Sequence, residues 1–158
     1  MEQTRIQALG DELYQAMVKR EAVSPLTSRG EDITIDDAYH ISLRMLERRL
    51  ADGASVIGKK IGVTSKAVQN MLNVHQPDFG YLTDDMVFNS GEVMPISDRL
   101  IAPRAEGEIA FILKKNLNGP GITNADVLAA TECVMPCFEI VDSRIQDWQI
   151  AIQDTIAD

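Results

Sequence analysis

The sequence predicts a single α+β domain of 158 residues. Helical periodicity dominates the first part of the chain, and short apolar runs separated by loops dominate the second part. This succession differs from the strand–helix alternation of a doubly wound sheet. We therefore expect residues 1–72 to form a mainly helical region with one strand, and residues 73–158 to form a mixed sheet.

Composition and charge exclude several classes of protein. The chain is 45% hydrophobic and 25% charged, as in ordinary globular domains. A net charge of −9 argues against a nucleic-acid partner, and the absence of a run of eighteen apolar residues argues against a membrane span. Because the N-terminus resembles no secretion signal and Cys133 and Cys137 fit reduced core thiols, we expect a cytoplasmic protein.

Two amphipathic helices are expected in the first part. An apolar stripe marks the helix over residues 4–20, namely Ile6, Leu9, Leu13 and Met17. Thr34 is expected to begin a second helix, with acidic residues in its first turn and two neighbouring stripes: Tyr39, Leu43, Leu46 and Leu50 in one, and Ala38, Ile41 and Met45 in the other.

The remaining elements are shorter. Breaker residues predict loops at 24–30 and 74–80, and Thr123 with Asp126 predicts the start of a helix ending near residue 130. Strands are expected at 56–62, 81–82, 86–88, 101–113 and 133–141, with a short helix at 65–72. The apolar run over residues 109–113 predicts a buried strand, and Pro136 predicts a bulge or an edge position.

Glu106 and Glu108 alternate along one expected strand and so share a face. Two carboxylates about 6–7 Å apart repel each other unless positive charge lies between them. Glu139 lies in an otherwise uncharged strand, where an unpaired charge is costly. A divalent cation such as Mg²⁺ or Mn²⁺ would suit all three. Alternatively, Glu106 and Glu108 face solvent and Glu139 pairs with Arg104 or Arg144.

Lys59 and Lys60 are expected to point to opposite faces of the strand over residues 56–62. If this strand is central, one lysine faces inward and needs a counter-charge or a chemical role. If it is an edge strand, both lysines are solvated. Asp78, in the loop after Pro77, could be a general base or a turn residue.

Several stretches resemble the 2-hydroxypenta-2,4-dienoate hydratase family of bacterial meta-cleavage pathways, in the fumarylacetoacetate hydrolase superfamily. They are the segment 57–71, His75-Gln-Pro-Asp-Phe-Gly80, Arg104-Ala-Glu-Gly-Glu-Ile-Ala-Phe111 and Glu139-Ile-Val-Asp-Ser-Arg144. The resemblance covers essentially the whole chain. The related 4-oxalocrotonate decarboxylases are similar in the lysine strand and the three carboxylates but differ in the segment matching 75–80, which favours the hydratase.

The resemblance implies a helical region followed by a mixed β-roll that houses the active site. Family members are longer, and the present chain ends at Asp158 within a patterned segment. We therefore expect the roll to be truncated at residue 158, with residues 73–158 forming its first part.

The resemblance also implies a metal-dependent hydro-lyase that converts a 2-hydroxy-dienoate to 4-hydroxy-2-oxopentanoate during the catabolism of aromatic compounds. Glu106, Glu108 and Glu139 match the family's metal ligands, and Lys60 and Asp78 match pocket positions. In the resulting hypothesis the ion stabilises an enolate, Lys60 supplies positive charge or a proton, and Asp78 orients or deprotonates water. The two roles could be exchanged, and the sequence does not decide between them. The alternatives are decarboxylase activity and a structural role beside the decarboxylase. We also expect a homo-oligomer and a complex with that decarboxylase.

Overall fold

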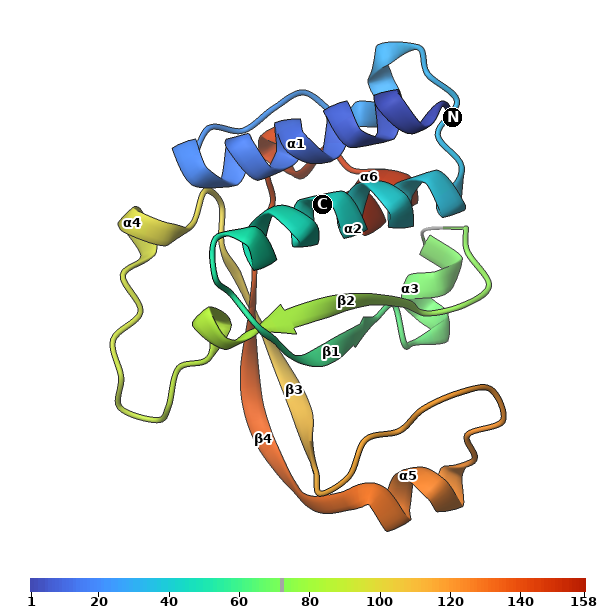
Figure 1. Cartoon of the computed structure of the whole chain (residues 1–158), viewed down its shortest axis with the longest axis vertical. Coiled ribbons are helices and arrows are strands. Elements are labelled where there is room, and N and C mark those ends of the chain that lie inside the picture. The colour runs from blue at the N-terminus through green and yellow to red at the C-terminus, as the bar shows by residue number, and fades with distance from the viewer. Residues whose placement is uncertain (72) are drawn as a thin grey trace. The chain divides into compact units, whose positions relative to one another are not determined.

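Helices and antiparallel strand pairs make up the structure, as expected for the α+β class (Figure 1). The structure is a computed structural model that describes residues 1–71 and 73–158. It contains two compact units: residues 1–102 together with 143–158, and residues 103–142. The prediction of a single domain divided at residue 72 stays a prediction.

The core of the first unit lies among three helices: α1 (Gln3–Lys19), α2 (Ile35–Ala51) and α6 (Ile152–Ala157). Both predicted long helices are confirmed. Leu9 and Leu13 of α1 pack with Ile41 of α2 and are fully buried. On α2, the stripe of Ala38, Ile41 and Met45 faces the core, whereas Leu43 and Leu50 of the other predicted stripe are exposed. A helix packed through one face on its neighbours leaves the adjoining stripe at the rim.

Gly10 lets α1 and α2 approach closely. A Cβ atom at this position would lie 2.5 Å from Cβ of Arg44 and 2.8 Å from the carbonyl oxygen of Ile41. Asp11, the next residue, accepts hydrogen bonds from the guanidinium groups of Arg48 and Arg44, which hold its pKa well below the usual range. The glycine and the ion pairs therefore join the same two helices.

A capping box begins α2 at Thr34, the predicted start of this helix. The Thr34 hydroxyl accepts from the backbone N–H of Asp37, and the Asp37 carboxylate accepts from the backbone N–H and hydroxyl of Thr34. The N-terminal ammonium of Met1 donates to the same carboxylate at 2.9 Å. The Thr34 hydroxyl and this ammonium lower the pKa of Asp37 to about 2.

The strands β1 (Val56–Gly62) and β2 (Asp78–Thr83) form an antiparallel pair in the first unit. Alternation places Phe79 and Thr83 on the face turned toward the helices. There Phe79 stacks on Tyr39 of α2 at a centroid distance of 4.7 Å, and Thr83 accepts a hydrogen bond from Arg49 of α2. The short helix α3 (Lys66–Met71) follows β1; the predicted helix extends to Leu72, which lies outside the described residues.

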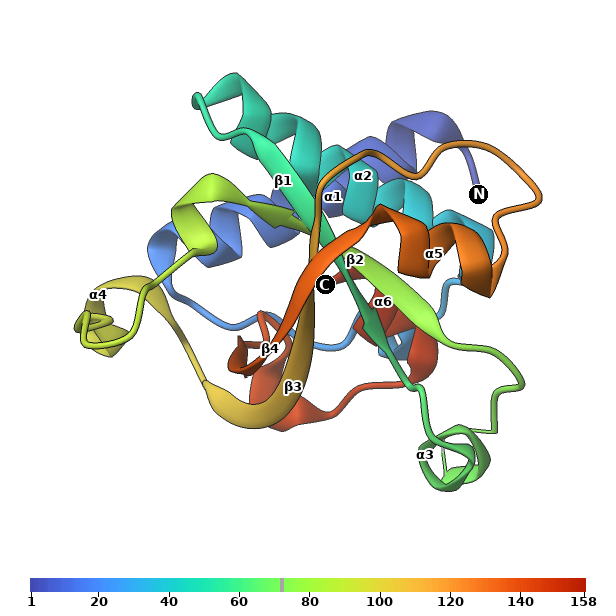
Figure 2. The same cartoon turned by 90° about the horizontal axis from the view of Figure 1, so that it is seen from below.

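The second unit consists of a long antiparallel pair, β3 (Arg104–Leu113) with β4 (Thr131–Val141), and the helix α5 (Asn124–Ala130) between them in sequence. Figures 1 and 2 show the two strands as a twisted ribbon. Thr123 and Asp126 form the predicted capping box of α5. Because the described sheet has two strands, Pro136 lies in an edge strand, as predicted.

Four shorter helices complete the first unit: η1 (Leu26–Arg29), η2 (Asp84–Met86), α4 (Ile96–Arg99) and η3 (Gln146–Trp148). Three local predictions are wrong. The loop at 24–30 contains η1, residues 78–80 belong to β2, and residues 86–88 form no strand because η2 ends at Met86. Isolated apolar triplets do not distinguish a strand from a turn.

Burial of the run over residues 109–113 is also a wrong prediction. Ile109 is 65% exposed and Phe111 is 53% exposed. Across the pair, Phe138 is 79% exposed on the same face. A strand pair and one short helix contain too few elements to enclose a core. The periodicity identified the strand but not its burial.

Among residues 1–71 and 73–158, no helix combines the length and the apolar character that crossing a bilayer requires.

The cap of α2 generates a prediction about acid stability. The folded pKa of Asp37 lies below the unfolded value of about 3.9, so its contribution to folding is present above pH 4 and is lost as the pH falls toward 2. We expect the difference in free energy of unfolding between the wild type and Asp37→Asn to shrink over this interval in urea titrations. Asp36→Asn, which changes an exposed carboxylate in the same turn, is the control. A difference that stays constant down to pH 2.5 would contradict the assignment.

Candidate functional site

Three carboxylates converge on one face of the β3–β4 pair. One carboxylate oxygen from each of Glu106, Glu108 and Glu139 lies within 4.8 Å of the other two. Glu106 and Glu108 are exposed, and Glu139 is half-buried. The structure therefore brings together the residues that the sequence singled out as metal ligands.

The strand register explains this convergence. Glu106 lies directly opposite Glu139 in the antiparallel pair, and Glu108 lies opposite Cys137. Side chains of directly opposed residues project to the same side and lie about 5 Å apart at Cβ. Alternation adds Glu108 to the same face two positions along β3. A shift of the register by one residue would send Glu139 to the other face.

Positive charge near the cluster can come from its own strand. Arg104 shares the face of Glu106 and Glu108 and lies opposite Val141, diagonal to Glu139, at a separation that long side chains can span. Arg144, the other arginine considered from sequence, donates from Nε to the Asp158 carboxylate at 2.6 Å. The acidic face could thus be balanced by Arg104, by a bound cation, or by both.

Lys60 and Asp78 meet on one face of the β1–β2 pair. Asp78 is directly opposite Gly62, and Lys60 is directly opposite Gly80. The Lys60 ammonium lies 3.0 Å from the point that a Cβ of Gly62 would occupy, and Oδ1 of Asp78 lies still nearer that point. An ammonium group and a carboxylate group are therefore neighbours on this face.

Lys59 points to the opposite face, as the alternation predicts. Its ammonium lies 5.3 Å from the centroid of Phe79 and 5.1 Å from that of Tyr81, within the range of a cation–π contact. Lys59 is exposed, whereas Lys60 is half-buried. The structure therefore separates a surface lysine from a lysine beside a buried acid.

Asp78 is a buried strand residue rather than a turn residue. It begins β2, its exposure is 7%, and its buried Oδ1 accepts no hydrogen bond within the part of the chain that the structure describes. Such an oxygen costs about 1–3 kcal/mol unless a donor satisfies it. Burial raises the pKa of Tyr39, and the negative charge of Asp78 raises it further. The carboxylate is therefore suited to receive a hydrogen bond or a proton from a bound molecule.

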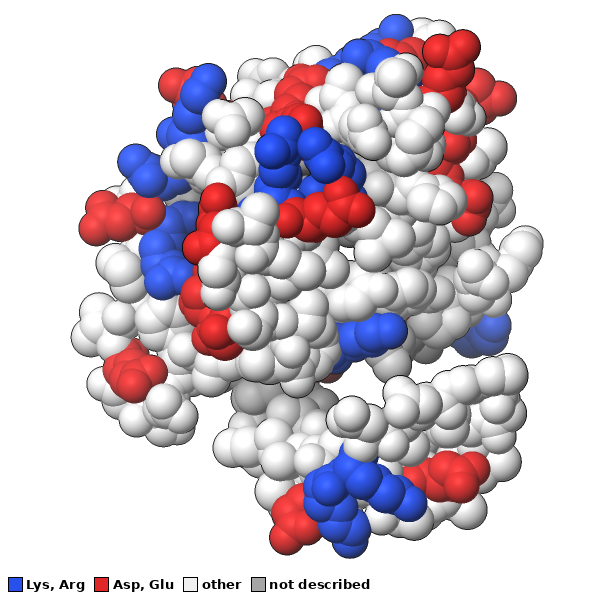
Figure 3. Space-filling model, in the orientation of Figure 1, with Lys and Arg blue, Asp and Glu red and all other residues white. Residues whose placement is uncertain are grey.

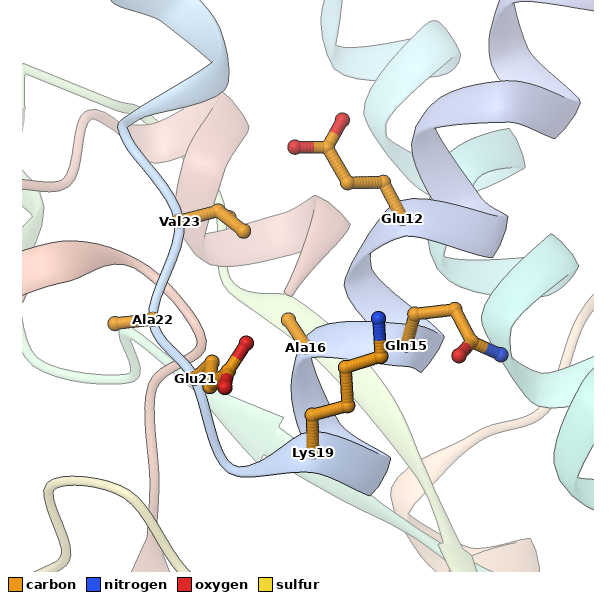
Figure 4. Close-up of a pocket in the computed structure, with 7 residues that line it drawn as sticks. All are labelled: Glu12, Gln15, Ala16, Lys19, Glu21, Ala22 and Val23. Carbon is orange, nitrogen blue, oxygen red and sulfur yellow. The ribbon is translucent and has the colours of Figure 1, made fainter.

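Two of the surface hollows formed by described residues of the first unit are of interest here. One, of about 180 Å³, lies beside α1 and contains none of the predicted site residues (Figure 4). The other, of about 290 Å³, is lined mainly by apolar side chains and includes Tyr39, His75 and Asp78. The face in Figure 3 shows acidic side chains interspersed with basic ones and no extended basic area, as the net charge suggests.

Sequence reasoning found the charged residues of these two faces but missed the glycines between them. Gly58, Gly62 and Gly80 lie on the same face as Lys60 and Asp78. The alternation of Gly58, Lys60 and Gly62 was the available signal. Its meaning depends on the cross-strand partner, which the sequence does not identify.

Comparison with known proteins identifies the family. No protein-family model matches the chain. It is 81% identical over 158 residues to a 2-hydroxypent-2,4-dienoate hydratase of Pseudomonas putida, covering all of this chain and 71% of the relative. The chain belongs to the 2-hydroxypenta-2,4-dienoate hydratase family. A second member, the 2-hydroxyhexa-2,4-dienoate hydratase of Comamonas testosteroni, is 62% identical over 154 residues, which are 97% of this chain and 58% of that protein.

Among solved structures, the fold of this chain is similar to that of a decarboxylase. A 4-oxalocrotonate decarboxylase from Pseudomonas putida G7, complexed with magnesium and adipate, matches with a TM-score of 0.92 and 30% identity. The match covers 99% of this chain and 59% of the decarboxylase. The same decarboxylase complexed with calcium and acetate matches with a TM-score of 0.90. The predicted superfamily and fold class are confirmed, and the hydratase names of the sequence relatives favour the hydratase branch.

The convergence of the three carboxylates generates a prediction in which the sign of a stability change depends on metal. In a metal-free sample, Glu106→Gln removes like-charge repulsion, so we expect its melting temperature to equal or exceed that of the wild type. With millimolar Mn²⁺ we expect the order to reverse, because ligands that bind the native state stabilise it. Glu132→Gln changes a carboxylate of β4 outside the cluster. The difference between its melting temperature and that of the wild type should keep the same sign with and without Mn²⁺. Equal responses of the two variants to Mn²⁺ would contradict a cation site.

Proposed function

We propose that the protein adds water to 2-hydroxypenta-2,4-dienoate and produces 4-hydroxy-2-oxopentanoate. The observation that carries this proposal is the convergence of Glu106, Glu108 and Glu139 in a chain of the hydratase family. The chain spans 71% of the length of one hydratase relative and 58% of another. The proposed activity is therefore that of a whole hydratase and is not assigned to these 158 residues alone.

We propose that the three glutamates hold a divalent cation, Mg²⁺ or Mn²⁺. Carboxylate oxygens are the donors that these hard ions prefer, and three of them on one face match that preference. The neighbouring decarboxylase structures are complexed with magnesium and with calcium, which supports a cation of this class. When bound, such an ion supplies Lewis-acid stabilisation of negative charge on substrate oxygens.

Lys60 and Asp78 supply the proton chemistry in this proposal. The ammonium of Lys60 stabilises negative charge on the substrate or donates a proton. The Oδ1 atom of Asp78, buried and without a donor among the described residues, accepts a hydrogen bond from the attacking water and then its proton. The reverse assignment, with Asp78 delivering the proton and Lys60 orienting the water, uses the same two groups.

The overall reaction balances with one water molecule. Loss of the proton from the C2 hydroxyl and delivery of a proton to C5 convert the dienol to a conjugated 2-oxo acid. The hydroxyl group of water then bonds to C4, and a proton is delivered to C3. Each step needs a group that moves a proton and a group that stabilises the oxygen anion at C2.

Decarboxylation of 4-oxalocrotonate is the second candidate, because a decarboxylase matches the fold with a TM-score of 0.92. That reaction would use the same stabilisation of an enolate but needs room for a second substrate carboxylate. The identities of 81% and 62% to hydratases favour hydration. A complex with the decarboxylase, self-association and a cytoplasmic location belong to this proposal.

Assays on both substrates test the function. We expect consumption of 2-hydroxypenta-2,4-dienoate, followed by its ultraviolet absorbance, to exceed that of 4-oxalocrotonate by at least about tenfold in kcat/KM. Chelation should abolish the activity, and Mg²⁺ or Mn²⁺ should restore it. Full activity after exhaustive chelation would refute the metal-dependent mechanism, and a preference for 4-oxalocrotonate would select the decarboxylase.

The two adjacent lysines provide a matched test of the proton chemistry. We expect Lys60→Ala to lower kcat/KM by about 100-fold or more, the usual effect of losing a positioned acid or base. Lys59→Ala removes an exposed cation–π contact and should change kcat/KM by less than about threefold. Comparable losses in the two variants would show that Lys60 has no special role.

A further inference from the structure

Gly62 occupies a position where a side chain would collide with the acid–base pair. A Cβ atom at this position would overlap Oδ1 of Asp78, and it would lie 3.4 Å from Cγ of Asp78 and 3.0 Å from Nζ of Lys60. Asp78 is its direct cross-strand partner, and Lys60 lies two residues earlier on the same face. The space beside Gly62 is therefore the space in which the two functional groups meet.

Backbone conformation does not explain this glycine. Gly62 lies in a regular part of β1 and does not have the positive φ found at Gly30 or Gly53, where the left-handed region favours glycine. Glycine inside a strand also weakens the strand relative to residues with side chains. Lack of a side chain is therefore the property that the position uses.

The collision would fall on Asp78 more than on Lys60. The contact of the added Cβ atom with Nζ of Lys60, at 3.0 Å, is less severe than its overlap with Oδ1 of Asp78. Asp78 is short and 7% exposed, so its carboxylate can leave the space only by a rotamer change against surrounding atoms. A methyl group at position 62 would thus displace the carboxylate more than the ammonium.

We infer that Gly62 is a positioning residue that keeps the Asp78 carboxylate beside the Lys60 ammonium. Its effect on turnover rests on the proposed function, whereas its effect on the Asp78 side chain rests on the strand geometry alone. Gly80, the cross-strand partner of Lys60, has a weaker form of the same role, because its Cβ would lie 3.4 Å from Cγ of Lys60.

Gly58 provides the matched control. It lies on the same face of the same strand, and a Cβ there would meet Cδ1 of Leu82 at an ordinary 3.8 Å. We expect Gly62→Ala to lower kcat by about tenfold to 100-fold, as displacement of a catalytic group by about 1 Å does, and to change the pH profile of kcat. Gly58→Ala should leave both within about twofold. Equal effects in the two variants, or an unchanged kcat in Gly62→Ala, would overturn the inference.

A double-mutant cycle tests the geometry without an activity assay. In an Asp78→Ala background the overlapping carboxylate is absent, and only Nζ of Lys60 remains close to the added Cβ atom. We therefore expect the drop in melting temperature caused by Gly62→Ala to be smaller in this background, by at least about 2–4 °C, than with Asp78 present. Gly58→Ala should have the same effect in both backgrounds. Additive shifts at position 62 would overturn the inference even if the protein is an active hydratase. Coupling in a protein that lacks hydratase activity would uphold the geometry and refute the proposed function.

Discussion

The register of the β3–β4 pair is the constraint on which the carboxylate cluster depends. Glu106 faces Glu139 across this pair, and the alternation of β3 brings Glu108 to the same side. Antiparallel pairing fixes this arrangement through backbone hydrogen bonds, so no side-chain contact is needed to collect the three carboxylates. The cluster places negative charges close together, and positive charge from an arginine or a cation would offset that repulsion.

In the β1–β2 pair, too, the strand register decides which residues lie opposite each other. Its register sets Asp78 against Gly62 and Lys60 against Gly80, so that each of these charged side chains lies opposite a residue without a side chain. The opposite face carries Phe79 and Thr83, which contact Tyr39 and Arg49 of α2. Asp78 also lies near the helices, because it lines a hollow with Tyr39 of α2 and Ile156 of α6.

The chain is similar to both hydratases and a decarboxylase, and the two reactions share part of their chemistry. Hydration of a 2-hydroxy-dienoate and decarboxylation of 4-oxalocrotonate both require negative charge to be stabilised beside a carboxylate. In the proposed mechanism a cation held by a cluster of hard oxygen ligands does this. The fold alone therefore does not separate the two reactions. The hydratase names of the sequence relatives, at 81% and 62% identity, favour hydration for this chain.

The sequence by itself determined the residue types and their local order. Periodicity identified α1, α2 and β1, and capping residues located the starts of α2 and α5, because these signals act within a few residues along the chain. Alternation put Glu106 with Glu108 and separated Lys59 from Lys60 for the same reason.

Tertiary structure decided what no local signal contains: Glu139 opposite Glu106, Asp78 in a strand rather than a loop, and Gly62 as the partner of Asp78. It also decided that Ile109 and Phe111 are exposed, because burial depends on which elements pack over a strand and not on the strand's own composition.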